Sequence, residues 1–403
     1  MRFLRNQDGN FAVLGAILLL PLAAAAGSAV DLSRVNAAGS VLQDQIDGAA
    51  LRAAKAARDA PSPATMQSAA ETAARAELSD PSMTPIVTIR GAAPVEVEVE
   101  VRRNIALMFG AAIGVPAADI RRSATAVAEP GDLLCLLLLA PSSDDTWKMT
   151  NTARVVAPGC GAQVNSRHRT SFAGALTAPV TTAATYAAAA VQPAKGFQPA
   201  PVFNSLVQPD PLAGRLLWPT RSGNCQAGEI DVRRLTDTET VLLPGVYCGG
   251  DLVFGAGRTV TLQAGRYVIE DGDLRLVRTA VVRGNDVSVI LLAPSATLFL
   301  GGTSVLALSA PTSGTWKDVA LAVKPQTSEN DSAIANSARL ELDGVLYLPS
   351  QRLLLSTAGT IAGPAGSSRL VITRRLSMSG SARLDLNGVD GVLGQSPSAW
   401  LKR

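Results

Sequence analysis

The pattern of apolar and polar residues divides the chain into three regions. Residues 11–30 (FAVLGAILLLPLAAAAGSAV) contain no charged side chain. Beyond them, apolar and small residues recur every three or four positions as far as Ala56, and Pro61 and Pro63 end this pattern. From residue 131 onward, short β-prone runs alternate with Gly, Pro, Asn and Ser. We therefore expect a mainly β protein with an N-terminal α region: a long helix, a small mixed module and a β-rich remainder.

The apolar run at 11–30 has the length of a transmembrane helix, because about 20 residues at a rise of about 1.5 Å each span a hydrocarbon core of about 30 Å. Arg2 and Arg5 precede the run and Asp31 follows it, so the positive-inside rule places residues 1–10 in the cytoplasm. The sequence thus predicts a single-pass membrane protein with its C-terminal bulk outside the cytoplasm. A cleaved signal peptide, suggested by the small residues at 23–29, and a buried core helix are the alternatives.

Residues 31–60 are expected to continue the same helix outside the membrane, on the side away from the cytoplasm. Apolar and small residues form a stripe at helical spacing along one face of it. The stripe contains Leu32, Val35, Gly39, Leu42 and Ile46. Its small side chains suit close packing against either its own domain or a partner helix. We therefore regard the stripe as the candidate surface for partner helices.

Residues 61–130 predict a compact α+β module. A short helix is expected over 65–79, and strands are expected over 86–90 and 120–128. Over 95–101, Val alternates strictly with Glu, which is typical of a strand with one buried and one solvent-facing side. A helix packed on one face of a sheet is the expected arrangement.

Residues 131–403 are expected to form a parallel β-helix, a solenoid of stacked coils. The β-prone runs recur about every 20 to 25 residues, and the sequence LPGVY at 243–247 is echoed by QAGRY at 263–267. Repeats of this period build units that bury a shared core by stacking. The Pro-, Ala- and Thr-rich stretch at 173–219 is expected to be a looser coil or a loop that crosses the solenoid face.

The four cysteines fit the same period. Cys135 and Cys160 are 25 residues apart in the sequence, and Cys225 and Cys248 are 23 apart. Adjacent coils lie about 4.8 Å apart, which is within the Cα separation that a disulfide requires. We therefore favour the disulfides Cys135–Cys160 and Cys225–Cys248, formed in an oxidising compartment. Free buried thiols are the alternative, and the lack of a C-x-x-C spacing argues against zinc.

Composition excludes several classes of function. The 403 residues carry a net charge of +3, 4% aromatic residues and a single histidine, His168. This balance gives no electrostatic footprint for nucleic acid, and one histidine does not suffice for a multi-histidine metal site. The sequence contains no nucleophile elbow, no P-loop and no dinucleotide-binding glycine motif. No cofactor is expected, and His168 is expected to be a surface residue.

Acidic residues at predicted corners leave an enzymatic alternative open. A β-helix can present carboxylates and basic groups along a groove, as polysaccharide-active enzymes require. The candidate groups are Glu270, Asp271 and Asp273, and the pair Lys317 and Asp318. Acidic residues beside glycine are more often turn formers. We therefore favour a role in turns and a protein that is not an enzyme.

The N-terminal third of the chain resembles the TadE/TadG-like proteins of Tad/Flp (tight adherence) pilus assembly. The matching residues are Gly9-Asn10, Gly27, Asp31, Arg34, Leu42-Gln43, Asp47 and Ala49-Ala50-Leu51. The segment at 104–128 also resembles that family's module, and several later stretches resemble the portion that follows it in many TadG-like chains. Five residues after Gly9 the chain has Leu14, where pilin precursors cut by a prepilin peptidase usually carry Glu, so a major pilin is not expected.

The resemblance implies a structural protein that acts in pilus biogenesis and adhesion. It also implies a bacterial inner membrane for the single-pass anchor, with residues 31–60 and the C-terminal bulk in the periplasm. Its implied partners are other Tad pilus-assembly proteins or pilins, with a possible contact to a surface or a glycan. A secreted adhesin with a cleaved signal peptide is a further alternative.

Overall fold

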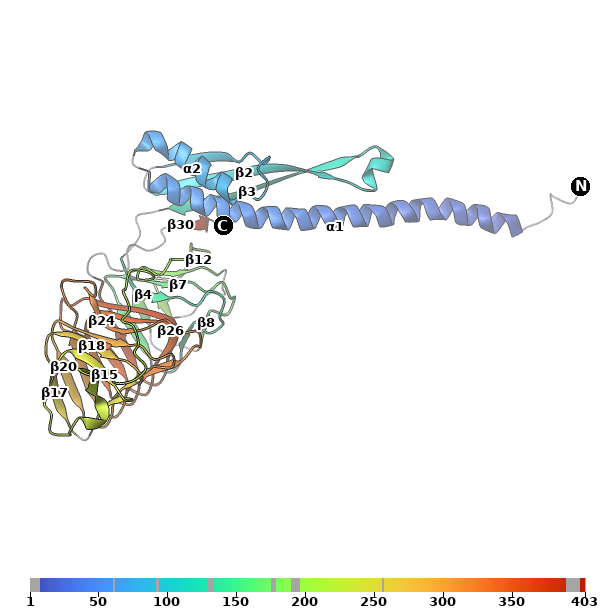
Figure 1. Cartoon of the computed structure of the whole chain (residues 1–403). Helices are drawn as coiled ribbons and strands as arrows, with labels where there is room; N and C mark the ends of the chain where they lie inside the picture. The colour runs from blue at the N-terminus through green and yellow to red at the C-terminus, as the bar shows by residue number, and fades with distance from the viewer. Residues whose placement is uncertain are drawn as a thin grey trace, which may run out of the picture. The chain divides into compact units, whose positions relative to one another are not determined.

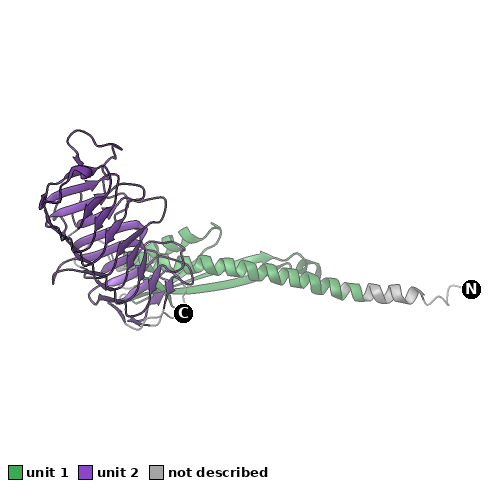
Figure 2. Cartoon of the chain, turned by 90° about the horizontal axis from the view of Figure 1, so that it is seen from below, with its two compact units in different colours: residues 1–130, 399–403 green, residues 131–398 purple. Residues whose placement is uncertain are grey.

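The computed structural model describes residues 8–60, 62–91, 94–128, 133–174, 179–189, 196–255, 257–388 and 399–402, without the side chains at 8–17, 20, 63 and 113. The chain divides into two units (Figure 2). Unit 1 contains residues 1–130 and 399–403, and unit 2 contains residues 131–398. Unit 2 is therefore inserted into the chain between two segments of unit 1.

Unit 1 is built around one long helix, α1 (Asp8–Arg58), of 51 residues. A second helix, α2 (Pro63–Glu77), begins with a proline, which suits the first turn because its missing N–H would have no intrahelical partner. α2 packs on the C-terminal part of α1 (Figure 1). Alanines at 53, 57, 70 and 74 are buried in these two helices, and their small side chains permit close packing.

The helices cover one face of an antiparallel sheet. Its strands, in spatial order, are β1 (Ile86–Arg90), β2 (Val95–Ala106), β3 (Ala117–Ala128) and β30 (Ala399–Lys402). The four valines of β2 from Val95 to Val101 are buried, and the glutamates between them are half-exposed. β2 and β3 continue beyond the other strands as a two-stranded ribbon beside α1, with the short helix η1 (Gly110–Ile113) at its tip (Figure 1).

The predicted transmembrane helix at 11–30 is corrected by the structure. Among residues whose side chains are described, no helix is both long enough and apolar enough to cross a membrane; the side chains at 11–17 and 20 lie outside the description. The prediction used the apolar character of the segment alone. It did not foresee that the ribbon tip packs against this helix at Gly27 and Asp31. The single-pass inner-membrane location with the bulk in the periplasm is corrected with it. Residues 1–7 of the predicted cytoplasmic segment lie outside the description, and the inner membrane as a partner stays a prediction.

Unit 2 is a parallel β-solenoid whose coils have three faces. In most of its coils a strand pairs in parallel with the strand three positions later in the chain, as in β15–β18, β18–β21 and β21–β24. Gly245 lies opposite Tyr267, which is 22 residues later in the chain. The similarity between 243–247 and 263–267 has a shift of 20 residues, so it did not predict the register. The region predicted as solenoid ends earlier than expected, because β30 pairs with β3 of unit 1.

The first part of the solenoid contains β4 (Leu134–Leu138), β5 (Trp147–Met149), β6 (Arg154–Ala157), β7 (Gly161–Val164), β8 (Phe172–Ala173), β9 (Val180–Thr182), β10 (Thr185–Ala187), β11 (Phe197–Gln198) and β12 (Val202–Phe203).

The second part contains β13 (Ile230–Asp231), η2 (Val232–Arg234), β14 (Val241–Leu242), β15 (Gly245–Cys248), β16 (Leu252–Phe254), β17 (Thr259–Leu262), β18 (Gly265–Ile269), β19 (Leu274–Leu276), β20 (Val281–Gly284), β21 (Val287–Leu291), β22 (Leu298–Leu300), β23 (Val305–Ser309), β24 (Val319–Val323), β25 (Asp331–Ile334), β26 (Arg339–Leu355), β27 (Thr360–Ala362), β28 (Arg369–Met378) and β29 (Arg383–Asp385).

The coils are not stacked in chain order. β4 pairs with β7 on one side and with β28 on the other, where Leu137 lies opposite Ile372. The first part of the chain therefore winds from the middle of the stack to one end at β12. The second part starts at the opposite end with β13 and winds back until β28 and β29 stack on β4, β5 and β6.

Residues 206–229 connect the two ends of the stack, and we call this segment the strap. Near its start, the side-chain amide of Asn165 donates to the carbonyl of Gln208 at 2.7 Å and accepts from its N–H at 2.9 Å. Farther along, the Tyr347 hydroxyl donates to Asp210 at 2.7 Å, and Leu212 is 1% exposed. The first half of the strap is therefore fixed to the solenoid by hydrogen bonds and a buried side chain, while residues 220–228 are exposed.

Both disulfides that the spacing favoured are present in unit 2. Cys135 and Cys160 join adjacent coils with a Cα separation of 5.7 Å. Cys225 and Cys248 have a Cα separation of 5.4 Å and join the end of the strap to β15. The second bond therefore has a role that its spacing did not reveal.

Candidate interaction surface on the long helix

One carboxylate fixes the ribbon tip to α1. Asp31 is 5% exposed and accepts hydrogen bonds from the backbone N–H groups of Met108 at 2.8 Å, Phe109 at 2.9 Å and Gly110 at 2.8 Å. Burial alone would raise the pKa of Asp31, but these bonds and the nearby Arg34 lower it below its ordinary value. The charged carboxylate therefore holds the tip at a defined place on the helix.

Gly27 provides the room that this contact needs. It lies one helical turn before Asp31 on the same face of α1. A Cβ atom at position 27 would come within 2.6 Å of the ring of Phe109, so any other residue would displace the ring. Gly27 and Asp31 are two of the residues that carry the resemblance to TadE/TadG-like proteins, and here they form a single contact with the ribbon tip.

The predicted partner stripe is divided between buried and exposed positions. Gly39, Leu42 and Ile46 are buried inside unit 1, and Leu42 and Ile46 have no exposed surface. Val35 is half-buried, and Leu32 is 61% exposed. The buried members serve the packing of their own domain, which was the other role that the sequence left open. Only Leu32 and, in part, Val35 remain accessible to a partner.

A second set of apolar side chains is exposed nearer the start of α1. Leu18, Leu19 and Leu22 are each at least 60% exposed, and the described side chains from 18 to 30 include no charged group. The ribbon tip bound to Asp31 adds further exposed apolar groups. We call the whole set the apolar tip surface: Leu18, Leu19, Leu22, Val30, Leu32, Met108, Phe109 and Val115. Exposed apolar side chains of this kind are typical of interaction sites.

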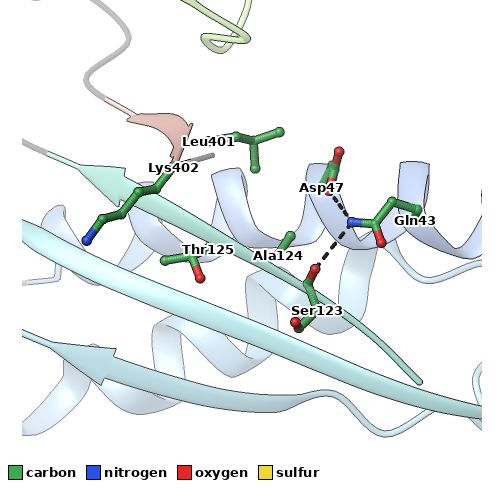
Figure 3. A pocket seen from close by; sticks show the side chains of 7 residues that line it. All are labelled: Gln43, Asp47, Ser123, Ala124, Thr125, Leu401 and Lys402. Carbon is green, nitrogen blue, oxygen red and sulfur yellow. Dashed lines mark hydrogen bonds between the residues drawn. The ribbon is translucent and has the colours of Figure 1, made fainter.

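A polar hollow of about 380 Å³ lies farther along α1, beside the end of β30 (Figure 3). The side-chain amide of Gln43 donates to Asp47 at 2.7 Å and to the carbonyl oxygen of Ser123 at 3.3 Å. Lys402 also lines the hollow, and its ammonium donates to Glu96 at 2.8 Å. The hollow marks the point where β30 ends and the outer edge of β3 is left without a strand.

The acidic residues considered for enzymatic chemistry hold the backbone of unit 2. Glu270 is 1% exposed and accepts from the N–H of Gly223 at 3.0 Å and from the N–H and hydroxyl of Ser222, both on the strap. Asp271 accepts from the N–H groups of Gly249 and Gly250. These carboxylates therefore bind backbone donors, as the turn-forming role requires.

The remaining acidic candidates also lie in turns. Asp273 accepts from the N–H of Thr297 at 2.8 Å, one coil away. Asp318, which follows Lys317, has a positive φ of 67° just before β24, a conformation that Asp adopts more readily than most residues. The structure thus gives each of these carboxylates a place in the connections between strands.

Neither His168 nor the cysteines form an open metal site. His168 is exposed, and its Nδ1 lies 3.0 Å from the hydroxyl of Thr170. Ligand atoms of Cys225, Glu229 and Cys248 lie within 4.8 Å of one another. The two sulfurs are joined to each other, however, and a zinc site would need them as thiolates.

Comparison with protein-family models, with curated proteins and with solved structures finds no match to this chain. Sequence analysis singled out Gly27 and Asp31 but missed their contact with the ribbon tip. Their spacing of one helical turn, on the buried face of α1, was the feature of the sequence that could have indicated this contact.

Proposed function

We propose that this protein is a structural component of Tad/Flp pilus assembly, similar to TadG-like proteins, and that it acts without enzymatic activity. We propose further that other Tad assembly proteins or pilins bind its apolar tip surface, and that it contributes to adhesion through the pilus. The observation that carries the proposal is the exposure of Leu18, Leu19 and Leu22 on a helix segment with no described charge.

The tip surface has the properties that a partner helix requires. Asp31 and Gly27 hold the ribbon against α1, so the apolar side chains are displayed on a rigid support. An amphipathic partner helix can pack its apolar side chains between those of α1. Burial of one leucine contributes about 1.5–3 kcal/mol, so three leucines contribute about 4.5–9 kcal/mol. The cost of association is about 4–15 kcal/mol, so the other members of the apolar tip surface must add to the binding free energy.

Unit 2 suits a mechanical role in such an assembly. Its strands form one continuous parallel stack, closed by the strap and by two disulfides. Disulfides form in oxidising compartments, where a surface structure is assembled. A stiff solenoid of this kind serves as a spacer or as a binding face, and the carboxylates of its turns are used to hold backbone.

The proposal is tested by deleting the gene and counting surface filaments by electron microscopy. We expect the deletion to abolish filaments and the wild-type gene to restore them. A gene with Leu19→Glu and Leu22→Glu should restore at most about a tenth of the filaments, because two buried charges weaken binding by more than about 1.4 kcal/mol. The matched control is Leu217→Glu, on the strap at 71% exposure, which should restore them fully.

Two results would contradict the proposal. A deletion strain with normal filaments would remove the role in pilus assembly. Full restoration by the Leu19→Glu, Leu22→Glu variant, at the protein level of the wild type, would show that partners do not bind the apolar tip surface.

A further inference from the structure

Strand β3 has a long open edge. β2 covers one of its edges along the whole length, from Ala117 to Ala128. β30 covers the other edge only from Thr125 to Ala128. No other strand in the described part of the chain pairs with this outer edge from Ala117 to Ala124, where Gln43 binds one carbonyl, that of Ser123. An open edge of this length is a template for another strand.

We propose that this edge pairs with the same edge of a second copy of the chain. The two copies of β3 run antiparallel about a two-fold axis at Ile120, and the two sheets become one. Such an interface is isologous, because the same surface of each copy is used. The inference goes beyond the proposed function and does not depend on the pilus assignment.

The order of side chains along β3 selects this register. Asp119 and Arg121 are exposed on one face of the strand, and Ile120 between them is buried on the face that α1 covers. With the axis at Ile120, Asp119 of each copy lies opposite Arg121 of the other. Opposite charges in directly facing positions stabilise a strand pair. The symmetry provides this charge pair twice.

Neighbouring registers lack this complementarity. With the axis one residue later, Arg121 faces Arg121 of the second copy; with the axis one residue earlier, Asp119 faces Asp119. Like charges in directly facing positions destabilise a strand pair. The register at Ile120 also brings Ala118 opposite Arg122, and Ala117 opposite Ser123, so the long side chain meets a small one.

The two charged residues keep hydrogen-bonding capacity for the second copy. Asp119 accepts from the side-chain amide of Asn104 at 2.7 Å through one oxygen. Arg121 contacts Glu100 through one terminal nitrogen. A carboxylate has two acceptor oxygens and a guanidinium has five N–H groups, so each can make a further bond.

The test is analytical ultracentrifugation of the full-length chain over a range of concentrations. We expect a dimer for the wild type. Arg121→Asp places Asp opposite Asp119, and we expect it to raise the dissociation constant at least about tenfold. The double variant Asp119→Arg, Arg121→Asp restores opposite charges and should return the dissociation constant to within about threefold of the wild type.

A matched control separates pairing from local effects. Arg90 on β1 also contacts a glutamate of β2, Glu98, but faces Glu96 and not a residue of β3. Arg90→Asp should therefore leave the dimer unchanged. A wild-type chain that stays monomeric, a dimer unaffected by Arg121→Asp, or a double variant as weak as the single one would overturn the proposal.

Crosslinking gives a test that does not need a charge change. Ile120→Cys places two thiols opposite each other at the axis, within disulfide reach. On a non-reducing gel we expect a covalent dimer for this variant and none for Ala124→Cys, whose side chain does not meet its own copy. Equal crosslinking of both variants would also overturn the proposed register.

Discussion

Asp31 joins α1 to backbone groups that follow it by 77 to 79 residues in the chain. Three N–H donors on one carboxylate satisfy most of its acceptor capacity, and the bond from Gly110 also satisfies the first donor of η1, which has no partner within that short helix. The contact therefore stabilises helix and ribbon tip together. The free energy that this contact contributes depends on the charge of the Asp31 carboxylate. Its dependence on pH can therefore be measured.

The predicted effect of pH follows from the lowered pKa of Asp31, whose ordinary value is 3.8. The folded chain favours the charged form, so this stabilisation is complete above the ordinary pKa and is lost as the pH falls through the lowered one. We expect Asp31→Asn to lower the free energy of unfolding at pH 6, with a deficit that shrinks below about pH 3.8. Urea denaturation of the wild type and of the Asp31→Asn variant, from pH 6 to below pH 3.8, measures the two free energies of unfolding.

The exposed Asp44 supplies the control for this prediction, because Asp44→Asn should leave stability nearly unchanged at every pH. Asp80, Glu96 and Glu100 also have lowered pKa values, but they titrate in both proteins and cancel in the difference. A deficit of constant size from pH 6 to pH 2.5 would show that the charge of Asp31 is not what binds the tip.

At the scale of elements, the strap depends on its ends. Cys225–Cys248 closes a loop of 23 residues, and Cys135–Cys160 closes one of 25, so chain entropy predicts about 3 kcal/mol of stabilisation for each. The two differ in what they hold. We expect Cys225→Ala with Cys248→Ala to lose about that free energy and also to expose the strap to proteases.

Limited proteolysis followed by mass spectrometry measures this exposure. Cleavage within residues 206–229 should increase strongly in the variant without Cys225–Cys248. Cys135→Ala with Cys160→Ala is the matched control, because it should lose a similar free energy while the strap stays protected. Equal cleavage of the strap in both variants would show that it is held by its other contacts.

The patterns of single elements were predictable from the sequence, because they follow from local physics. The alternation from Val95 to Val101 indicated a half-buried strand, and the cysteine spacings indicated neighbouring coils. The role of Asp31 was not predictable, since its partners are backbone groups, which are identical in every residue. The strap was equally hidden: its contacts, such as Tyr347 to Asp210, join residues 137 apart.

At the scale of the whole molecule, the order of coils is the main departure from expectation. A repeat period predicts that coils stack, but it does not say which coil is the neighbour of which. Trp147 and Leu376 lie opposite each other although 229 residues separate them, and both are fully buried. The same limitation explains why β30 was placed in the solenoid and not beside β3.

A double-mutant cycle tests this order. Trp147→Leu and Leu376→Ala remove facing side chains, so their effects on the free energy of unfolding should be non-additive by about 1 kcal/mol. Trp147→Leu combined with Phe254→Leu, in a strand at the end of the stack, should be additive to within about 0.5 kcal/mol. Urea denaturation of the full chain measures both cycles. Additivity of Trp147 and Leu376 would contradict the contact between β5 and β28.

The contact between β28 and β4 also has a consequence for the protein during its synthesis. The ribosome releases β4 long before it makes β28. The edge of β4 that pairs with β28 therefore stays unpaired while more than two hundred residues are translated. A chain that stops short of Arg369 would keep that bare strand permanently, ready to recruit another nascent polypeptide. The stack can therefore grow from the first rung only toward β12, and the other side of β4 is covered when β28 pairs with it.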